Sequence, residues 1–556
     1  MKQGARKTLS SVLALLTAVT AFGAVSASAA EPAVYTRGDV NGDGAVNVAD
    51  AQLALGEYSR SMAGKESSLT AEQKSAADIN KDTKLDVADA QTILIYYCAT
   101  GLKNTKRTWA DFLSPAYSDM KVPNTGEKLT IVGWGELTEP MEMVEDFVAK
   151  YPQYTDLVEY KSIGDITDTG KAEDLETYLK SGGDADLCIV TGHTLNNYTA
   201  NSEKSLPLSD LGFKDADFEP IYNAVMTEGA GLNDVPTGIS WYTEPGCYVY
   251  RADLAKLYLG AETPAEMQEF VKDWETFDQT AAKLAELSGN KCKITAWVGD
   301  FAKVFPSLRR TPWLDEQSML QFGQEETDFL NRLRLYCQKG YMTMHAERYD
   351  NDDWYLDSWT GMFQGNDKEN ISREVAHALG TFMSAWELKP FGTLNAIEYS
   401  SETEKRESYG QFRVTQGPAA WIAPDGNFLF VPKSADNGSL ARKFLDTYIF
   451  DENKAAEFAK ERGIFSSNAN VNRKIEKDGY KNPMLGGQSQ YGILDQNAAA
   501  ADTRYAKTQL DYELNDGFMY LAKDFAEATD YDADYVLTQL DNACSDYPQI
   551  KHRTQN

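Results

Sequence analysis

Short apolar segments alternate with amphipathic segments through most of the chain. Leu129–Trp134 and Asp186–Val190 have the character of buried strands, whereas Met141–Tyr151 and Ala172–Lys180 have the spacing of amphipathic helices. Strands that alternate with helices are typical of parallel sheets covered by helices. The pattern therefore predicts an α/β fold from residue 128 to residue 556, and about 430 residues are enough for two lobes.

A shorter unit before this region repeats one pattern twice, at residues 39–50 and 78–89, and an apolar helix is expected after each copy, at residues 51–58 and 90–97. Oxygen-bearing side chains stand at positions 1, 3, 5, 9 and 12 of each copy, and a backbone carbonyl is available at position 7. This is the ligand order of a calcium loop. The predicted ligands are Asp39, Asn41, Asp43, Ala45, Asn47 and Asp50 in the first loop, and Asp78, Asn80, Asp82, Lys84, Asp86 and Asp89 in the second.

Two features distinguish these loops from an ordinary EF-hand. Position 12 is Asp rather than Glu, and position 6 of the second loop is Thr83, where the first loop has Gly44. A sharp turn at this position favours glycine, so the second site is expected to bind calcium more weakly. Acidic surface loops that bind nothing are the alternative, but the repetition of the pattern makes this alternative improbable.

The duplicated loop and helix, with Asp at position 12 and Ala-Gln after it, resembles a dockerin, the module that binds cohesins on cellulosome-type scaffoldins. The dockerin is assigned to residues 31–103 and residues 104–127 to a linker. The resemblance implies that loop positions 10 and 11 contact the cohesin, namely Val48, Ala49, Val87 and Ala88. Because both copies read Val-Ala, docking in two orientations is expected.

Composition and charge limit the partners. Residues 1–30 read as a secretory signal peptide without a nearby lipid-anchor cysteine, so a secreted chain without its own membrane anchor is expected. The net charge of -30 makes nucleic acid and anionic membranes poor partners. Four scattered histidines argue against a histidine metal site, and most of the six cysteines are expected to be buried free thiols.

The large region resembles the extracellular solute-binding proteins of ABC importers, in particular the oligosaccharide-binding branch. The resemblance rests on the order of several short segments, among them residues 133–136, 183–186, 235–238, 248–254, 273–277, 374–380, 429–434 and 463–468. It implies a hinged periplasmic-binding-protein-like fold with two parallel-type sheets. Lobe one is expected at about 128–238 and 425–465, and lobe two at about 239–424 and 466–556.

A pyranose needs flat aromatic rings for stacking and polar groups for its hydroxyls. Burial in a core is the alternative for each candidate tryptophan, because burial is the usual state of this residue. Trp134, Trp241 and Trp386 are favoured because they follow predicted strands. The full set of candidate ligand contacts is Trp134, Glu136, His193, Trp241, Tyr242, Trp297, Asp300, Trp313, Trp386 and Trp421.

These observations lead to a functional hypothesis: a non-enzymatic oligosaccharide-binding protein that holds two calcium ions in its dockerin and docks on a cohesin. Delivery of the sugar to an ABC permease is a further possibility. A dockerin-borne glycoside hydrolase is the main alternative, because most dockerin-bearing proteins are enzymes. The 84 acidic residues carry no weight for it, since a pair of carboxylates can always be nominated in so acidic a chain. A ligand-free spacer or interaction domain is the third.

Overall fold

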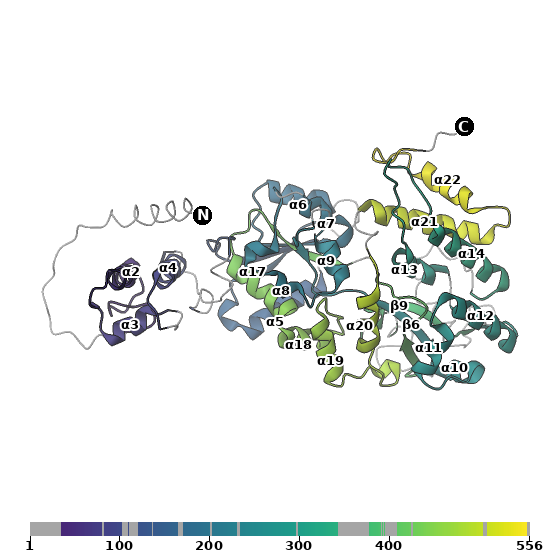
Figure 1. Cartoon of the computed structure of the whole chain (residues 1–556), viewed down its shortest axis with the longest axis horizontal. Helices are drawn as coiled ribbons and strands as arrows, with labels where there is room; N and C mark the ends of the chain where they lie inside the picture. Colours follow the sequence, from purple (N-terminus) through teal and green to yellow (C-terminus); the bar gives the residue numbers. More distant parts are fainter. Residues whose placement is uncertain are drawn as a thin grey trace. The chain divides into compact units, whose positions relative to one another are not determined.

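The computed structural model divides the chain into two compact units, residues 1–105 and 106–556. It describes residues 35–79, 83–102, 109, 120–135, 137–164, 171–200, 203–230, 234–295, 298–342, 377–390, 392, 394, 409–423, 426–503 and 509–552. The predicted signal peptide lies outside these residues, as does the predicted linker from 104 to 119 apart from Trp109. Figure 1 shows the elements of each unit.

The N-terminal unit is helical. It contains α2 (Val48–Met62), α3 (Ala71–Ala77), α4 (Val87–Tyr96) and a π-helical turn at Tyr97–Leu102. The helices α2 and α4 pack against each other, so the two predicted loop-helix motifs form one body. Its core is small and includes Val40, Ala54, Ile79 and Ile93.

The larger unit begins with a mixed sheet in the order β2-β1-β3-β11-β4, with β5 also paired to β11. Strands β1, β2 and β3 are parallel, whereas β11 runs antiparallel to β3, β4 and β5. The strands are β1 (Leu129–Gly133), β2 (Val158–Ser162), β3 (Leu187–Thr191), β4 (Ser205–Leu206), β5 (Gly238–Ile239) and β11 (Asn427–Pro432).

The first lobe, as we name the body built on this sheet, has helices that alternate with its strands. They are α5 (Thr138–Lys150), α6 (Lys171–Lys180), α7 (Gly192–Thr199), α8 (Asp215–Phe218), α9 (Asn223–Ala230), α17 (Gly438–Leu445) and α18 (Glu452–Arg462), with short turns at Pro152–Tyr154, Leu208–Leu211 and Asp446–Phe450. The strands and helices predicted at residues 129–134, 141–151, 172–180 and 186–190 are therefore present, with ends that differ by a few residues.

The second lobe contains a three-stranded sheet in the order β10-β6-β9, made of β6 (Gly246–Arg251), β9 (Gly380–Ser384) and β10 (Phe412–Thr415). Both pairings are antiparallel, so the prediction of two parallel-type sheets was wrong for this lobe. The central strand β6 pairs with two strands from much later in the chain, and no single helix crossover dictates their direction. A separate short pair, β7 (Cys292–Lys293) and β8 (His377–Ala378), is parallel.

Helices surround this smaller sheet: α11 lies against β10, α13 against β9 and α20 against β6 (Figure 1). Their bounds are α10 (Ala252–Leu259), α11 (Pro264–Val271), α12 (Trp274–Ser288), α13 (Val298–Leu308), α14 (Gln324–Lys339), α21 (Gln509–Glu527) and α22 (Ala533–Ala543), with a 3₁₀ turn at Trp386–Leu388. A second apolar core forms where α13, α14, α21 and α22 meet.

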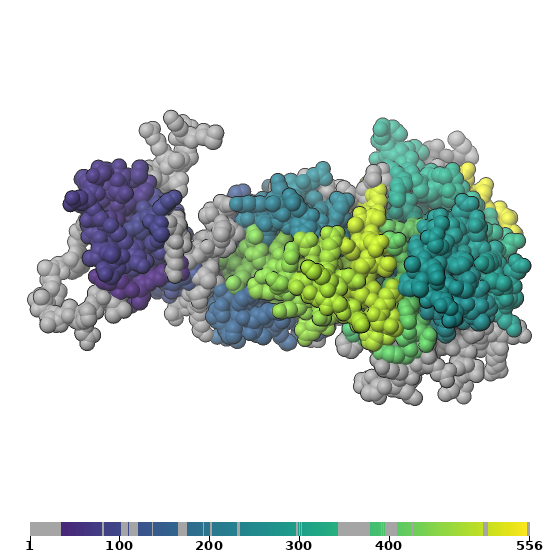
Figure 2. Space-filling view, turned by 60° about the horizontal axis from the view of Figure 1, so that its bottom comes forward, coloured from purple at the N-terminus to yellow at the C-terminus, as the bar shows by residue number. Residues whose placement is uncertain are grey.

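Three chain segments cross between the lobes side by side. The amide of Thr243 donates to the carbonyl of Phe465 at 3.0 Å, and the amide of Ala423 donates to the carbonyl of Glu244 at 2.8 Å. After the last crossing, α19 (Ala469–Lys477), a turn at Pro483–Leu485 and α20 (Tyr491–Ala500) continue the surface from the first lobe toward the second (Figure 2). These segments join the apolar core that contains strand residues of both lobes, and α20 packs against β6 of the second lobe.

Four cysteines are buried free thiols, at positions 188, 247, 292 and 544, which matches the expectation for most of the six. Cys337 is partly buried, and Cys98 in the N-terminal unit is exposed. Among the described residues, no helix is both long enough and apolar enough to cross a membrane.

Candidate functional site

The first predicted calcium loop folds tightly around its own carboxylates. Asp39 accepts from the amides of Asp43 at 3.1 Å and Gly44 at 2.9 Å. Asn41 Oδ1 accepts from the amide of Asp43 at 2.9 Å, and Asp43 Oδ1 from that of Ala45 at 2.9 Å. These bonds bring the oxygens of positions 1, 3 and 5 together within one short loop, as a hard divalent cation requires.

Asp50, at position 12, closes the loop from the first turn of α2. Its Oδ1 accepts from the amides of Val40 at 2.8 Å and Asn41 at 2.9 Å, and its Oδ2 accepts from the amide of Asn47 at 2.8 Å. Asn47 is the N-cap of α2, and with Asp50 it forms a capping box. The side chain of Asp50 is buried, and this burial raises its pKa. A short carboxylate thus reaches the loop because the helix begins directly beside it.

The second loop is built in the same way where it is described. The amides of Ile79 and Asp86 donate to Asp89 at 2.9 and 3.0 Å, and the amide of Thr83 donates to Asp78 Oδ2 at 2.9 Å. Two of its predicted ligands, Asn80 and Asp82, lie outside the described residues. Lys84 lies beyond the turn and is exposed.

The donor set fits calcium on two observations. Asp78 Oδ1 is buried and has no hydrogen-bond partner among the described residues, so a carboxylate oxygen is available for a ligand. Thr83 has a φ of 69°, close to the 85° of Gly44 in the first loop. The left-handed turn is therefore kept at Thr83 despite the side-chain strain, which supports the expectation that both segments fold as the same type of loop.

The four residues predicted to contact a cohesin start the two helices. Val48, Ala49 and Ala88 are exposed, and Val87 is partly exposed. Val48 is 37% exposed, so its side chain is accessible at the start of α2. The assignment of these residues to cohesin binding remains a prediction.

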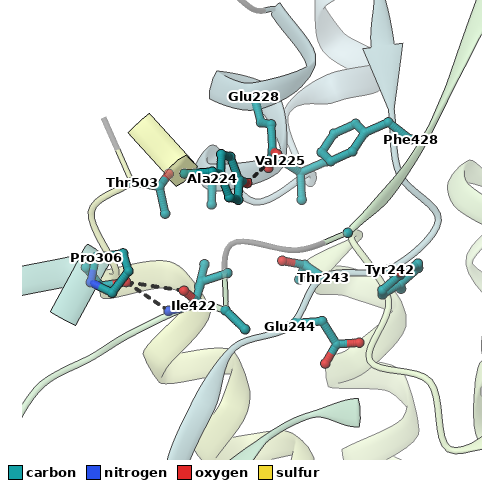
Figure 3. Close-up of a pocket in the computed structure, with 14 residues that line it drawn as sticks. Ala224, Val225, Glu228, Tyr242, Thr243, Glu244, Pro306, Ile422, Phe428 and Thr503 are labelled. Carbon is teal, nitrogen blue, oxygen red and sulfur yellow. Dashed lines mark hydrogen bonds between the residues drawn. The ribbon is translucent and has the colours of Figure 1, made fainter. Parts of the chain in front are cut away.

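The larger unit has a narrow pocket that is lined by residues of both lobes. Figure 3 shows its walls, which come from α9 and β11 of the first lobe, the crossing segments, and α13 and α21 of the second lobe. Tyr242, Thr243 and Glu244 line it from the first crossing, and Ile422 and Ala423 from the second. The hydroxyl of Tyr512 donates to Glu228 Oε1 at 3.0 Å and joins α21 to α9.

A charged network adjoins the pocket. Lys389 of the second lobe pairs with Glu139 in the first turn of α5, with 2.5 Å between Nζ and Oε1. The indole Nε1 of Trp241 donates to the other oxygen of Glu139 at 3.1 Å. The ammonium of Lys389 also lies 5.4 Å from the ring centroid of Tyr242. An ion pair and an aromatic contact therefore connect the two lobes beside the crossing segments.

Glu244 is the buried acid of this network. Its Oε2 accepts from the amide of Trp386 at 2.5 Å. Burial is the main cause that raises the pKa of Glu244 to about 7, and Glu139 and Glu387 add to the effect, whereas Lys389 and the Trp386 amide oppose it. The carboxyl group is therefore balanced between its neutral and charged forms near neutral pH.

The predicted aromatic contacts differ in how far their rings are exposed. Trp386 is 51% exposed beside the network, and Tyr242 lines the pocket. Trp134 and Trp241 are buried in the apolar core, at 6% and 2% exposed, so neither presents an open ring face.

Trp313 and Trp421 are corrections to the predicted set. Both lie in the core of the second lobe, at 1% and 0% exposed. The guanidinium of Arg309 lies 3.6 Å from the ring centroid of Trp313, whose Nε1 donates to Asn515 Oδ1 at 3.2 Å. The ring of Trp421 fills the space beside Gly246, where even a methyl group would clash. Packing accounts for both residues, and neither presents a surface to a ligand.

The structure leaves four predicted contacts untested. Glu136 and Trp297 lie outside the described residues, and the side chains of His193 and Asp300 lie outside them as well. Conversely, the sequence did not indicate Glu139, Glu244 or Lys389. Each stands in a segment with ordinary helix-start or loop composition, and only the tertiary fold brings the three together.

Comparison with known proteins supports both units. Residues 37–96 match the model of the dockerin type I domain. No curated protein matches the chain.

The solved structures similar to the chain share its two-lobed fold. A crystal structure of an extracellular solute-binding protein of family 1 has a TM-score of 0.57 at 17% identity, and the match covers 74% of this chain and 97% of that one. The sugar-binding protein MalE from Xanthomonas citri has a TM-score of 0.55 at 17% identity, with 74% and 96% covered. The galacto-N-biose-/lacto-N-biose I-binding protein from Bifidobacterium longum has a TM-score of 0.53 at 15% identity, with 77% and 97% covered.

The chain therefore carries a dockerin type I domain at residues 37–96, and its larger unit has the fold of the extracellular solute-binding proteins.

Proposed function

We propose that this chain is a non-enzymatic, secreted oligosaccharide-binding protein that its dockerin attaches to a cohesin-bearing scaffold. The observation that supports sugar binding best is the interlobe site, where the exposed ring of Trp386 lies beside a network of carboxylate, ammonium and tyrosine groups. A pyranose has weakly apolar ring faces and a belt of hydroxyls, so it needs this combination of a flat aromatic surface and polar groups.

The pocket between the lobes suggests how such a ligand would be held. The contact between Tyr512 and Glu228 and the pair between Lys389 and Glu139 each join one lobe to the other. A sugar chain would enter when the lobes separate and would be enclosed when they close. Binding of this type needs no chemical step, because the sugar binds the closed conformation better than the open one and so shifts the protein toward closure.

Attachment rests on the dockerin. Asp39, Asn41, Asp43, Asn47 and Asp50 would hold one calcium ion with the carbonyl of Ala45, and the second loop would hold another. Calcium neutralises the clustered carboxylates and fixes the starts of α2 and α4, where the exposed Val48 and Ala88 stand. A cohesin is the partner that the dockerin implies.

Isothermal titration calorimetry of the full chain tests the binding function. The titrants are cellotetraose, maltotetraose, xylotetraose and mannotetraose, and saturable heat with at least one of them is expected. The same preparation, incubated with the matching polysaccharides, is expected to release no reducing sugar. Absence of heat with all four would contradict the sugar assignment, and release of reducing sugar would favour the enzymatic alternative.

A further inference from the structure

The segment that carries Trp386 is anchored on both sides of the tryptophan. Ala385 and Leu388 are 3% and 1% exposed and belong to the apolar core that contains strand residues of both lobes. Pro390 then approaches the last crossing so closely that a Cβ at Gly463 would lie 2.5 Å from its Cδ. The segment from Ala385 to Pro390, which we name the Trp386 strap, is therefore held against the junction of the lobes.

Carboxylates fix the backbone of the strap at its start. The amide of Trp386 donates to Glu244 at 2.5 Å, and the amide of Ser384 donates to Glu387 at 2.8 Å. Glu387 also pairs with Lys303 of α13 at 2.6 Å. These contacts tie the strap to the crossing segment and to the second lobe, but not to α5.

One ion pair supplies the connection to α5. Lys389 is in the strap, three residues after Trp386, and its ammonium reaches Glu139 at 2.5 Å. The Lys389 side chain is 10% exposed and that of Glu139 is 27% exposed, so water screens the pair only partly. The Trp241 indole occupies the second oxygen of Glu139 and fixes the direction of the carboxylate.

We propose that Glu139 and Lys389 are positioning residues that set the place of the Trp386 ring relative to the first lobe. This proposal rests on the proposed function, because it concerns the ring that would stack on the sugar. The ion pair acts through the strap and makes no contact with the sugar itself. When it is present, closure of the lobes brings a preset aromatic surface to the ligand, and the entropy cost of ordering the strap on binding is reduced.

The substitutions Glu139→Gln and Lys389→Met test the proposal, with the double variant as the third protein. Each single change is expected to raise the oligosaccharide Kd about tenfold, which corresponds to a loss of roughly 1.4 kcal/mol of binding free energy. The double variant is expected to bind about as weakly as either single variant, because the two residues act as one unit. Lys389→Arg retains the ion pair and is expected to restore most of the affinity.

The chain offers a matched control on the same helix. Glu142 of α5 pairs with Arg462 of α18 at 2.7 Å, with side-chain exposures of 38% and 22%. This pair resembles the proposed one in exposure, and in the described structure neither side chain forms a hydrogen bond or ion pair with the strap. The substitution Glu142→Gln is therefore expected to leave the oligosaccharide Kd unchanged.

Hydrogen exchange in the sugar-free protein gives a second readout. The backbone amides of the strap are expected to exchange faster in Glu139→Gln and in Lys389→Met than in the unaltered chain or in Glu142→Gln. Unchanged exchange in the strap, or additive losses of affinity in the double variant, would overturn the positioning role. If the unaltered chain bound none of the four tetrasaccharides, the proposed function would fail, while the exchange result would still decide whether the pair orders the strap.

Discussion

Replacement of Glu244 by glutamine should make the larger unit more stable at neutral and alkaline pH. Glutamine has nearly the same shape and keeps an oxygen that can accept from the Trp386 amide, but it cannot ionise. The acid that it replaces is 5% exposed and lies among Glu139, Glu387 and Lys389. The substitution therefore removes a buried charge and keeps the packing.

The magnitude follows from the two pKa values of Glu244. The pKa is about 7 in the folded protein and 4.5 in the unfolded chain, a difference worth about 3 kcal/mol. Between pH 4.5 and 7 the folded state holds a proton that the unfolded state releases, so the free energy of unfolding falls as the pH rises through this window. The loss is complete above pH 7 and absent below pH 4.5. Because glutamine does not ionise, the Glu244→Gln variant does not lose this part of its unfolding free energy at any pH.

Urea unfolding at a series of pH values from about 4 to 8 measures the effect. All ten tryptophans lie outside residues 37–96, so their fluorescence follows the larger unit without a signal from the dockerin. The difference in unfolding free energy between Glu244→Gln and the unaltered chain should grow by about 3 kcal/mol from the acid to the alkaline end. Asp186, whose pKa is raised to about 6 by burial, titrates in both proteins and cancels in the difference.

A matched control is Glu461→Gln, because the Glu461 side chain is 73% exposed. The difference in unfolding free energy between Glu461→Gln and the unaltered chain should stay constant across the same pH range. If the Glu244→Gln difference is equally flat, Glu244 is not a buried acid with a raised pKa, and the reasoning on the interlobe network is refuted.

Four further results are expected. Trp386→Ala should raise the oligosaccharide Kd by about tenfold in calorimetry with little change in Tm, since the ring is 51% exposed; an unchanged Kd would exclude stacking on this ring. Chelation of calcium should abolish binding to immobilised cohesin modules and reduce the helical circular dichroism signal, and binding that survives chelation would contradict the calcium mechanism. Thr83→Gly should strengthen the weaker calcium site several-fold, because it removes about 1 kcal/mol of left-handed backbone strain at φ 69°, and calorimetric calcium titration would detect this. Cys98 should react with a thiol reagent in the folded chain while Cys188 reacts only after unfolding, as mass spectrometry of the labelled peptides can show.

Sequence patterns predicted secondary structure well where the residues that determine it are neighbours in the chain. A helix follows each of the two predicted calcium loops, because ligand spacing and helix caps are properties of consecutive residues, while the individual ligands stay a prediction. The φ of 69° at Thr83 follows from the same local plan. The strands at Leu129–Gly133 and Leu187–Thr191 were equally predictable, since continuous apolar segments are buried in nearly any fold of this class.

The interlobe site was predictable only in part. The sequence indicated Trp386 and Tyr242, but it selected Trp313 and Trp421 by the same argument, and these two are core residues. Residue type and position after an apolar segment cannot distinguish a tryptophan that faces a cleft from one that packs between helices. The direction of the second-lobe strands was missed for a similar reason, because β6 pairs with strands more than 100 residues later in the chain.

The sequence by itself thus determined the dockerin, its helices and the two-lobed α/β character of the larger unit. Only the tertiary structure decided which aromatic rings are exposed, and only it brought Glu139, Glu244 and Lys389 into one network. The physical reason is distance along the chain. Glu139 and Lys389 are separated by 250 residues, so their ion pair exists only because the folded lobes place α5 beside the Trp386 strap.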